Sequence, residues 1–133
     1  MFKKLYYYYH HYKMWNYIVG QLKAHPQAEL YILKIEYLKK RRNLAKRVKI
    51  GACCLCSYDS LIRKPGVHYC HHCPLYKKYN KTCCDKGSLF YTLQPSIRYA
   101  IPSIDRITAA KKIRDCVLFW KNRRYKRNNN ESK

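Results

Sequence analysis

Residues 53–56 read Cys-Cys-Leu-Cys, and residues 70–75 read Cys-His-His-Cys-Pro-Leu. Each stretch contains two cysteines separated by two residues, and 13 residues (57–69) lie between the two pairs. Because a tight turn with this spacing lets both sulfurs reach one ion, two such pairs are the usual way to arrange four thiolates around zinc. The sequence therefore predicts one structural zinc ion. Its simplest ligand set is Cys53, Cys56, Cys70 and Cys73.

The same cysteine module, residues 53–84, contains other groups that can replace one of these ligands. Cys83 and Cys84 follow the second pair closely enough for a thiolate to fold back onto the metal. Histidine is also a zinc ligand. Three histidines lie in the module, at positions 68, 71 and 72. The two histidines inside the second pair are expected to point away from the metal, toward solvent or a phosphate. Because Cys83, Cys84 or a histidine could still replace one of the four cysteines, the final ligand set stays open.

Two other roles for the cysteines fit the sequence less well. A disulfide framework is typical of secreted proteins, but residues 1–22 are tyrosine-rich and amphipathic rather than an apolar run with a small-residue cleavage site. We therefore expect a reducing, intracellular compartment. An iron–sulfur cluster usually requires a tighter run of cysteines. Cys116 lies apart, beside Val117 and Leu118, and we expect a small buried side chain rather than a ligand.

Positive charge is the second dominant feature of the sequence. The chain of 133 residues has 29 lysines and arginines against 7 aspartates and glutamates, which gives a net charge of +22. Like charges at this density repel one another unless a polyanion lies against them. Nucleic acid is the first expectation for that partner, and an anionic membrane surface is the second. No apolar run reaches the roughly 20 residues that a membrane-spanning helix requires, so we expect no stable membrane insertion.

A tyrosine-rich amphipathic helix is predicted over residues 3–24. Its apolar side chains recur at spacings of three and four residues, which places them on one stripe. The stripe contains Tyr8, Tyr12, Trp15, Val19 and Leu22, widened by Tyr9 and Ile18. Because tyrosines occupy residues 6–9 without a break, some rings must face solvent, where rings can stack on bases. The helix should end near His25, since the residue before a proline avoids the α region.

A second helix is predicted over residues 27–48, with Pro26 at its start. The short joint at residues 25–26 favours an antiparallel hairpin of the two helices. Arg41 interrupts the apolar stripe, which otherwise contains Leu30, Leu33, Tyr37, Leu44 and Val48. Positive side chains crowd the end of this helix as candidate phosphate contacts, and all of them except Arg41 should project to solvent. They are Lys39, Lys40, Arg41, Arg42, Lys46, Arg47 and Lys49.

The cysteine module is predicted to be largely irregular. Residues 58–69 form its loop, with a turn at residues 63–66, and a short two-stranded ribbon is an option beside the cysteine pairs. Within residues 76–79, two tyrosines flank Lys77 and Lys78. Alternating rings and ammonium groups are what single-stranded RNA binders use for stacking and for phosphate contact. The plain alternative for this segment is an exposed turn.

A third helix is predicted over residues 104–126, with Ser103 as its N-cap. Residues 86–102 before it contain two prolines and no clear period, so we expect an irregular connector with one short strand at residues 89–93. The end of this helix forms a second basic cluster, made of Arg123, Arg124, Lys126 and Arg127. Residues 1–127 are thus predicted to form one domain, followed by a disordered polar tail at residues 128–133.

The cysteine spacing resembles that of a group of small cysteine-rich bacteriophage proteins of unknown function. The residues that carry the resemblance are Tyr6 to Trp15, Cys53, Cys56, Cys70, Cys73, Pro74, Leu75 and Cys84. The resemblance implies a tyrosine-rich first helix, a helix at the end of the chain, and a phage or mobile-element context in the cytoplasm of a host cell. It implies no activity. The net charge of +22 departs from these more acidic proteins, so a shared partner is not implied.

No catalytic constellation is apparent, and we expect a protein without enzymatic activity. None of the seven carboxylates pairs with a histidine at a recognisable spacing. A zinc ion held by four thiolates is closed to substrate. An HNH-type nuclease would need a further histidine after His72, and the chain has none. A zinc deaminase would need a His-x-Glu motif, which is also missing.

Together these features predict a mainly α, zinc-stapled domain that binds nucleic acid. RNA or a ribonucleoprotein is preferred, because aromatic residues are abundant and no DNA-recognition helix is visible. In a phage context, the expected role is inhibition of a host nucleic-acid machine, for example by occupying the channel of a CRISPR effector. The alternative is a protein–protein adaptor that presents the tyrosine-rich first helix to a host protein complex. A third option is a peripheral protein on anionic lipid.

Overall fold

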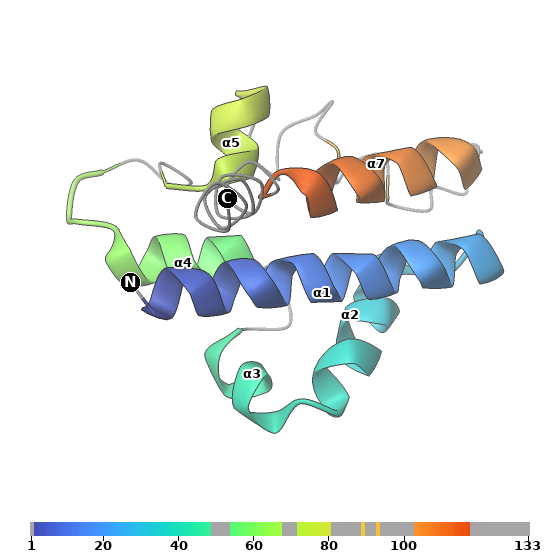
Figure 1. Ribbon diagram of the computed structural model, residues 1–133, viewed down its shortest axis with the longest axis horizontal. Coiled ribbons are helices and arrows are strands. Elements are labelled where there is room, and N and C mark those ends of the chain that lie inside the picture. The colour runs from blue at the N-terminus through green and yellow to red at the C-terminus, as the bar shows by residue number, and fades with distance from the viewer. Residues whose placement is uncertain are drawn as a thin grey trace, which may run out of the picture.

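The structure is a computed structural model, and it describes residues 2–48, 54–67, 72–80, 89, 93 and 103–117. Every regular element within these residues is an α-helix, which confirms the prediction of a mainly α fold (Figure 1). The helices are α1 (Phe2–Ala24), α2 (Leu30–Lys39), α3 (Arg42–Arg47), α4 (Cys54–Ile62), α5 (Pro74–Tyr79) and α7 (Ser103–Asp115). None of the helices in these ranges is both long and apolar enough to cross a membrane.

Helix α1 is the central element of the fold, and it runs along the length of the molecule in Figure 1. Helix α7 packs beside it in the opposite direction. At one end of this contact, His11 lies 2.7 Å from the carbonyl oxygen of Ile113. At the other end, Arg106 donates to the carbonyl of Pro26, just beyond the end of α1. Helix α4 packs against the N-terminal part of α1.

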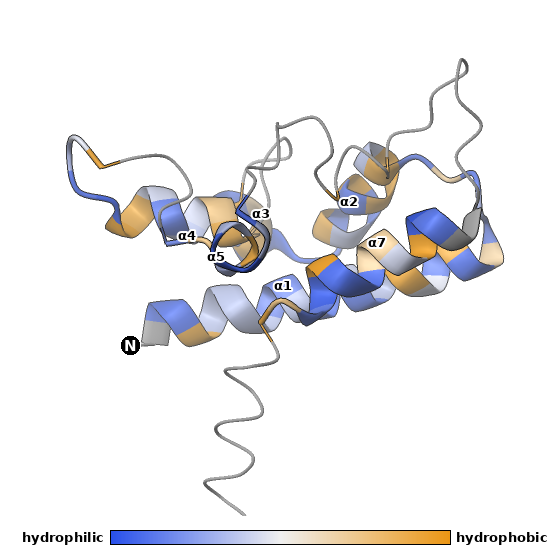
Figure 2. Cartoon of the chain, turned by 90° about the horizontal axis from the view of Figure 1, so that it is seen from above, coloured by the Kyte–Doolittle hydropathy of each residue, from blue (hydrophilic) through white to orange (hydrophobic). Residues whose placement is uncertain are grey.

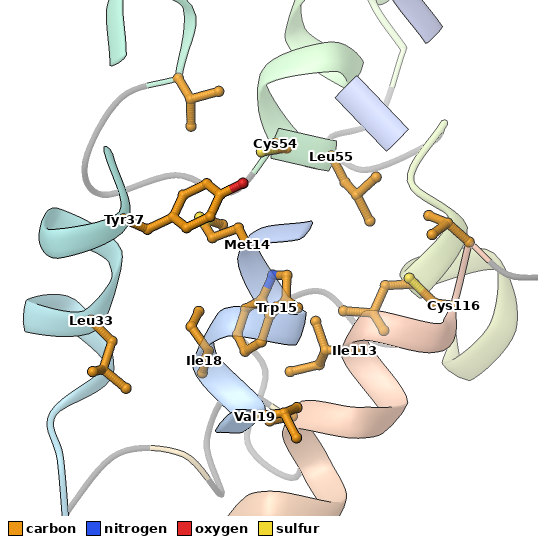
Figure 3. Close-up of a cluster of buried hydrophobic side chains, with 14 of the residues drawn as sticks. Met14, Trp15, Ile18, Val19, Leu33, Tyr37, Cys54, Leu55, Ile113 and Cys116 are labelled. Atoms are coloured by element: carbon orange, nitrogen blue, oxygen red, sulfur yellow. The ribbon is translucent and has the colours of Figure 1, made fainter. Parts of the chain in front are cut away.

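The core lies where α1, α2, α4 and α7 meet (Figure 3). Trp15 and Ile18 of α1 are fully buried at its centre. The neighbouring helices surround them with further apolar side chains, which are Leu33, Tyr37, Leu55 and Ile113. Because α1 is covered on more than one side, it buries a wider face than a helix at the edge of a bundle does.

The prediction for α1 is confirmed in its bounds and in most of its apolar stripe. Tyr12 is only partly buried, whereas the rest of the five-residue stripe is buried. The assignment of Tyr9 to the stripe is wrong, because its side chain is 55% exposed. In its place the structure buries Tyr7, His11 and Met14. These residues face α4 and α7. The periodicity of α1 alone does not predict that these two helices pack against it.

The second predicted helix, residues 27–48, is wrong in its continuity. The chain turns at residues 25–28, α2 begins at Leu30, and the helix is broken before α3 at Lys40 and Arg41. Arg41 has φ −131° and ψ 77°, which is not helical. In a continuous helix Arg41 would fall on the apolar stripe that packs against α1. The break lets its guanidinium stay exposed instead.

The antiparallel course predicted for this region is retained across the break. The ring centroids of Tyr17 and Tyr37 are 5.7 Å apart. Further along α3, the Arg47 guanidinium lies 4.8 Å from the centroid of the Tyr6 ring. Contacts therefore move toward the start of α1 as the chain advances through α2 and α3, so these helices run antiparallel to α1.

The cysteine module is more helical than predicted. Helix α4 covers residues 54–62, most of which were expected in a loop, and α5 begins directly after Cys73. Pro74 occupies the first turn of α5, where its missing N–H costs nothing. The predicted turn before the second pair is confirmed, with Gly66 at φ +85° and the Val67 N–H bonded to the Lys64 carbonyl.

Two further strand predictions are not supported by the described residues. No ribbon accompanies the parts of the cysteine module in residues 54–67 and 72–80, where the regular elements are α4 and α5. Leu89 and Leu93, the described ends of the strand predicted at residues 89–93, have helical conformation. Leu93 is fully buried.

The third predicted helix, residues 104–126, is also wrong at its end. Helix α7 ends at Asp115, and Cys116 and Val117 form a turn. The carbonyl of Ile113 faces the ring of His11, and it also accepts from the Cys116 N–H at 3.4 Å. In a continuing helix this carbonyl would accept from residue 117 instead. Residues 118–133, which include the predicted basic cluster and the predicted tail, lie outside the described residues.

Candidate metal centre and nucleic-acid interface

Two of the four predicted zinc ligands lie in the described part of the chain. Cys56 lies in the first turn of α4 and is partly buried, and Cys73 is the N-cap residue of α5 and is 5% exposed. The other two, Cys53 and Cys70, lie outside the described residues, as do the alternative ligands Cys83, Cys84, His68 and His71. Among the residues described, no three His, Cys, Asp or Glu side chains converge closely enough to hold a metal ion.

A buried carboxylate, Asp59, links the segments that carry Cys56 and Cys73. Its side chain lies one helical turn after Cys56 and is only 2% exposed. One oxygen accepts a 2.9 Å hydrogen bond from the backbone N–H of His72, the residue before Cys73. The other oxygen accepts from Arg63 at 3.3 Å. Sequence reasoning missed Asp59, although an Asp and an Arg four residues apart in a helix are a recognisable pair.

The remaining described cysteines lie in the core. Cys54 is fully buried near Tyr37, and Cys116 is 8% exposed, as predicted for a small buried side chain. Along with Cys56 and Cys73, these residues are thiols rather than disulfide partners. Cys54, which adjoins the predicted ligand Cys53, therefore serves packing rather than a surface role.

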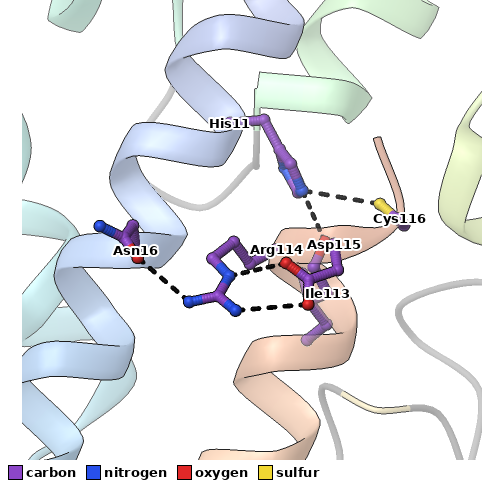
Figure 4. A network of polar contacts seen from close by, with 6 residues as sticks. All are labelled: His11, Asn16, Ile113, Arg114, Asp115 and Cys116. Atoms are coloured by element: carbon purple, nitrogen blue, oxygen red, sulfur yellow. Dashed lines mark hydrogen bonds and ion pairs between the residues drawn. The ribbon is translucent and has the colours of Figure 1, made fainter. Parts of the chain in front are cut away.

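His11 ties the end of α7 to α1 (Figure 4). Its Nε2 lies 2.7 Å from the carbonyl oxygen of Ile113 and 3.6 Å from the sulfur of Cys116. Because a carbonyl only accepts, Nε2 carries the hydrogen and donates. Burial lowers the pKa of His11 to about 4, and the positive charge of Lys34 acts in the same direction. The ring is therefore neutral near pH 7.

A second polar contact joins the same two helices at the surface. The Arg114 guanidinium donates to both carboxylate oxygens of Asp115, at 2.7 and 3.3 Å (Figure 4). It also donates to the side-chain oxygen of Asn16 on α1, at 3.1 Å. Arg114 is thus engaged with a carboxylate of its own helix, unlike the basic residues of α2 and α3.

The basic residues of α2 and α3 form one exposed cluster, which we name the α2–α3 basic surface. It consists of Lys39, Lys40, Arg41, Arg42, Lys46 and Arg47, all of them exposed. The ion pairs found within the described residues are Arg63–Asp59 and Arg114–Asp115, so none involves this surface. In Figure 2 the segment that joins α2 and α3 is strongly hydrophilic.

The other predicted nucleic-acid contacts are only partly described. Lys77 and Lys78 are exposed on α5, as expected. The flanking tyrosines of α5 pack against the core and are partly buried, so their rings offer less free surface than an exposed turn would. The remaining predicted contacts lie outside the described residues. They are Lys49, Arg123, Arg124, Lys126 and Arg127.

Cations and aromatic rings are paired over the surface beside α2 and α3. The Arg41 guanidinium lies 3.7 Å from the centroid of the Tyr37 ring. On α1, the Lys13 ammonium lies 5.6 Å from the centroid of the exposed Tyr9 ring. Sequence reasoning assigned Tyr9 to the core and did not select Lys13. Their four-residue spacing on one helix was the available indication that they meet.

Comparisons of this chain with protein-family models, with curated proteins and with solved structures found no match.

Proposed function

We propose that this chain is a zinc-stabilised nucleic-acid-binding protein without enzymatic activity, and that RNA or a ribonucleoprotein is its partner. The observation that carries the proposal is the α2–α3 basic surface. Six exposed cations lie within residues 39–47, and in the described part of the chain none is paired with a carboxylate. Uncompensated positive charge at this density is stabilised by a polyanion, and the phosphates of nucleic acid supply one.

Arginine chemistry favours phosphate over a generic acidic surface. A guanidinium presents donors in a planar fork that matches phosphate oxygens, and it also stacks on aromatic rings. Arg41 and Arg47 both lie over tyrosine rings, so each has an orientation in which the remaining N–H groups can face a ligand. These two residues are the best-organised phosphate contacts in the described chain.

We further propose that zinc holds the cysteine module together, with Cys53, Cys56, Cys70 and Cys73 as ligands. One feature supports a fit to zinc. The hydrogen bond from the His72 N–H to Asp59 holds the Cys56 and Cys73 segments against each other. The ion would supply folding free energy rather than chemistry.

The adaptor alternative receives less support from the packing of α1. Tyr7 and Tyr8 are buried in the core, and Tyr6, Tyr12 and Tyr17 pack against it. Tyr9 is the tyrosine of α1 that stands exposed. A protein-binding hot spot needs several large side chains on one face, and α1 directs most of its tyrosines inward.

A pull-down of the tagged protein from a host lysate tests the proposal, with half of the loaded resin treated with nuclease and washed before elution. The control is a variant in which Lys39, Lys40, Arg42 and Lys46 are replaced by glutamine, which leaves both stacked arginines in place. We expect the natural protein to retain RNA, and any attached proteins to leave after nuclease treatment. We expect the variant to retain much less. A protein partner that survives nuclease, with no RNA recovered, would contradict the proposal. Recovery of an intact ribonucleoprotein would extend it to inhibition of a host machine, with a CRISPR effector as one case.

A further inference from the structure

The surface where α1 meets α2 and α3 combines rings and cations in one place. We name it the aromatic–cation surface. It consists of Tyr6, Tyr9, His10 and Lys13 of α1 together with Arg41 and Arg47. This surface includes two residues of the α2–α3 basic surface, but its rings all come from α1. It therefore offers a ligand more than positive charge.

The rings of α1 form a continuous set at this surface. The His10 ring centroid lies 4.4 Å from that of Tyr6 and 5.3 Å from that of Tyr9. Burial lowers the pKa of His10, and the nearby charge of Arg41 lowers it further. His10 is therefore neutral near pH 7 and contributes a ring rather than a charge. Tyr9, at 55% exposed, presents the most open ring of the set.

Arg41 is fixed in position before any ligand arrives. One terminal N–H donates to the carbonyl of Tyr37 at 2.9 Å, and the guanidinium lies over the Tyr37 ring. Only one of its five N–H donors is used in this bond. A side chain held in this way loses less conformational entropy when it binds a phosphate than a mobile lysine does.

The ion pairs of the described residues, Arg63–Asp59 and Arg114–Asp115, do not involve this surface. Glu36 of α2 is exposed, and its carboxylate accepts a hydrogen bond from the Tyr17 hydroxyl at 3.1 Å. The Tyr17 ring lies beside the Tyr37 ring, whereas Arg47 lies over Tyr6, nearer the start of α1. The positive charge of Lys13, Arg41 and Arg47 is therefore not neutralised by a carboxylate ion pair in the described residues.

We propose that the aromatic–cation surface binds unpaired nucleotides of a single strand, with a base stacked on Tyr9 and adjacent phosphates held by Arg41 and Arg47. A duplex hides the faces of its bases, whereas a single strand exposes them to rings. Cations alone would favour any polyanion equally, so the exposed ring beside the fixed arginine is the feature that selects a single strand. This inference rests on the proposed function and adds a ligand class to it.

Fluorescence anisotropy with labelled oligonucleotides tests the inference. The probes are an oligouridine RNA and an oligothymidine DNA of about 12 nucleotides, within the range of known single-strand site sizes, and a duplex of the same length. Inorganic polyphosphate, which has charge but no bases, serves as a competitor. The variants are Tyr9→Ala and the matched control Tyr31→Ala, because Tyr31 on α2 is equally open at 57% exposed.

We expect single strands to bind more tightly than the duplex, and Tyr9→Ala to weaken single-strand binding about tenfold, the usual scale for loss of one stacked base. The same variant should leave competition by polyphosphate unchanged, and Tyr31→Ala should change neither value. Equal effects of the two variants, or equal affinity for single strand and duplex, would overturn the inference while leaving nucleic-acid binding intact. Failure to bind any of the three nucleic acids would instead overturn the proposed function. Circular dichroism of both variants checks that they fold.

Discussion

His11 is the residue through which α1 holds the end of α7. Its pKa is lowered from 6.5 to about 4 by burial, so the folded protein keeps the ring neutral while the unfolded chain does not. As the pH falls below 6.5, the unfolded state takes up a proton first. Stability contributed by the neutral ring is therefore present above pH 6.5 and lost as the pH falls toward 4.

We predict that this loss reaches roughly 3 kcal/mol at pH 4, from the difference between the two pKa values. Urea unfolding at pH 7 and at pH 5 measures most of the effect. Because acid would also weaken the proposed thiolate–zinc bonds, the comparison is made against His11→Gln, which keeps a donor for Ile113 but does not titrate. A pH dependence of the same size in the variant would show that His11 is not its source.

Arg106 is a second residue whose role only the fold reveals. It is 1% exposed, and it donates to the carbonyls of Pro26, Ala28 and Leu93. Burial lowers its pKa, yet an arginine stays charged. One guanidinium thus satisfies three carbonyls from two separate segments of the chain.

We predict that Arg106→Met lowers the free energy of unfolding by about 2 kcal/mol, because buried carbonyls would lose their donors. Chemical denaturation measures this change. The control is Arg114→Gln, which removes a more exposed arginine from the same helix and should cost less than about 1 kcal/mol. Equal destabilisation in the two variants would mean that the Arg106 hydrogen bonds add nothing beyond those of a surface arginine.

At the scale of elements, the contact between α4 and the start of α5 decides whether the cysteine module is organised as proposed. Asp59 makes that contact through the backbone of His72. We predict that Asp59→Ala lowers zinc affinity by about tenfold or more, as the removal of supporting hydrogen bonds does in other metal sites. Asp59→Asn should retain more affinity, since its amide oxygen can still accept from His72.

Competition with a chromogenic chelator measures that affinity. Cys73→Ser removes a proposed ligand and gives the lower limit of zinc binding. Cys116→Ala alters a buried thiol elsewhere and should bind zinc like the natural protein. If Asp59→Ala matches Cys116→Ala, then the hydrogen bond does not position the ligands. If Cys73→Ser keeps a full equivalent of zinc, then the proposed ligand set is wrong.

The elements also show which structural features the sequence could predict. Helix α1 was predictable because its apolar spacing is regular from Tyr8 to Leu22, over about four turns. The break between α2 and α3 was not predicted. It occurs at Arg41, which would otherwise fall on the apolar stripe and whose guanidinium lies over the Tyr37 ring. The early end of α7 depends on His11, a residue far away in the chain. The local periodicity of the sequence predicts neither of these two contacts.

For the candidate site, the sequence predicted the basic residues at positions 39–47 as contacts, and it predicted the exposure of all of them except Arg41. It did not predict the rings that accompany them. Charge is read directly from residue type, and lysines and arginines are rarely buried. Which tyrosine of the run at residues 6–9 faces solvent depends on the helices that cover α1. The packing of α4 and α7 buries Tyr7 and Tyr8 and leaves Tyr9 open.

At the scale of the whole molecule, charge is the dominant property. A net charge of +22 over 133 residues acts against compaction. The fold places six of these charges on the α2–α3 basic surface, away from the core around Trp15. If this surface binds nucleic acid as proposed, release of condensed counterions would make the binding strongly salt-dependent, with a slope that reports the number of phosphates neutralised.

The salt dependence of binding to single-stranded RNA tests the central claim most directly. The affinity of the natural protein is measured over a series of salt concentrations and compared with the variant in which Lys39, Lys40, Arg42 and Lys46 are glutamine. We predict a steep fall of log affinity with log salt, and a slope shallower by about 0.7 for each phosphate that the variant no longer neutralises. Affinity that does not depend on salt, or an identical slope in the variant, would contradict nucleic-acid binding by the α2–α3 basic surface.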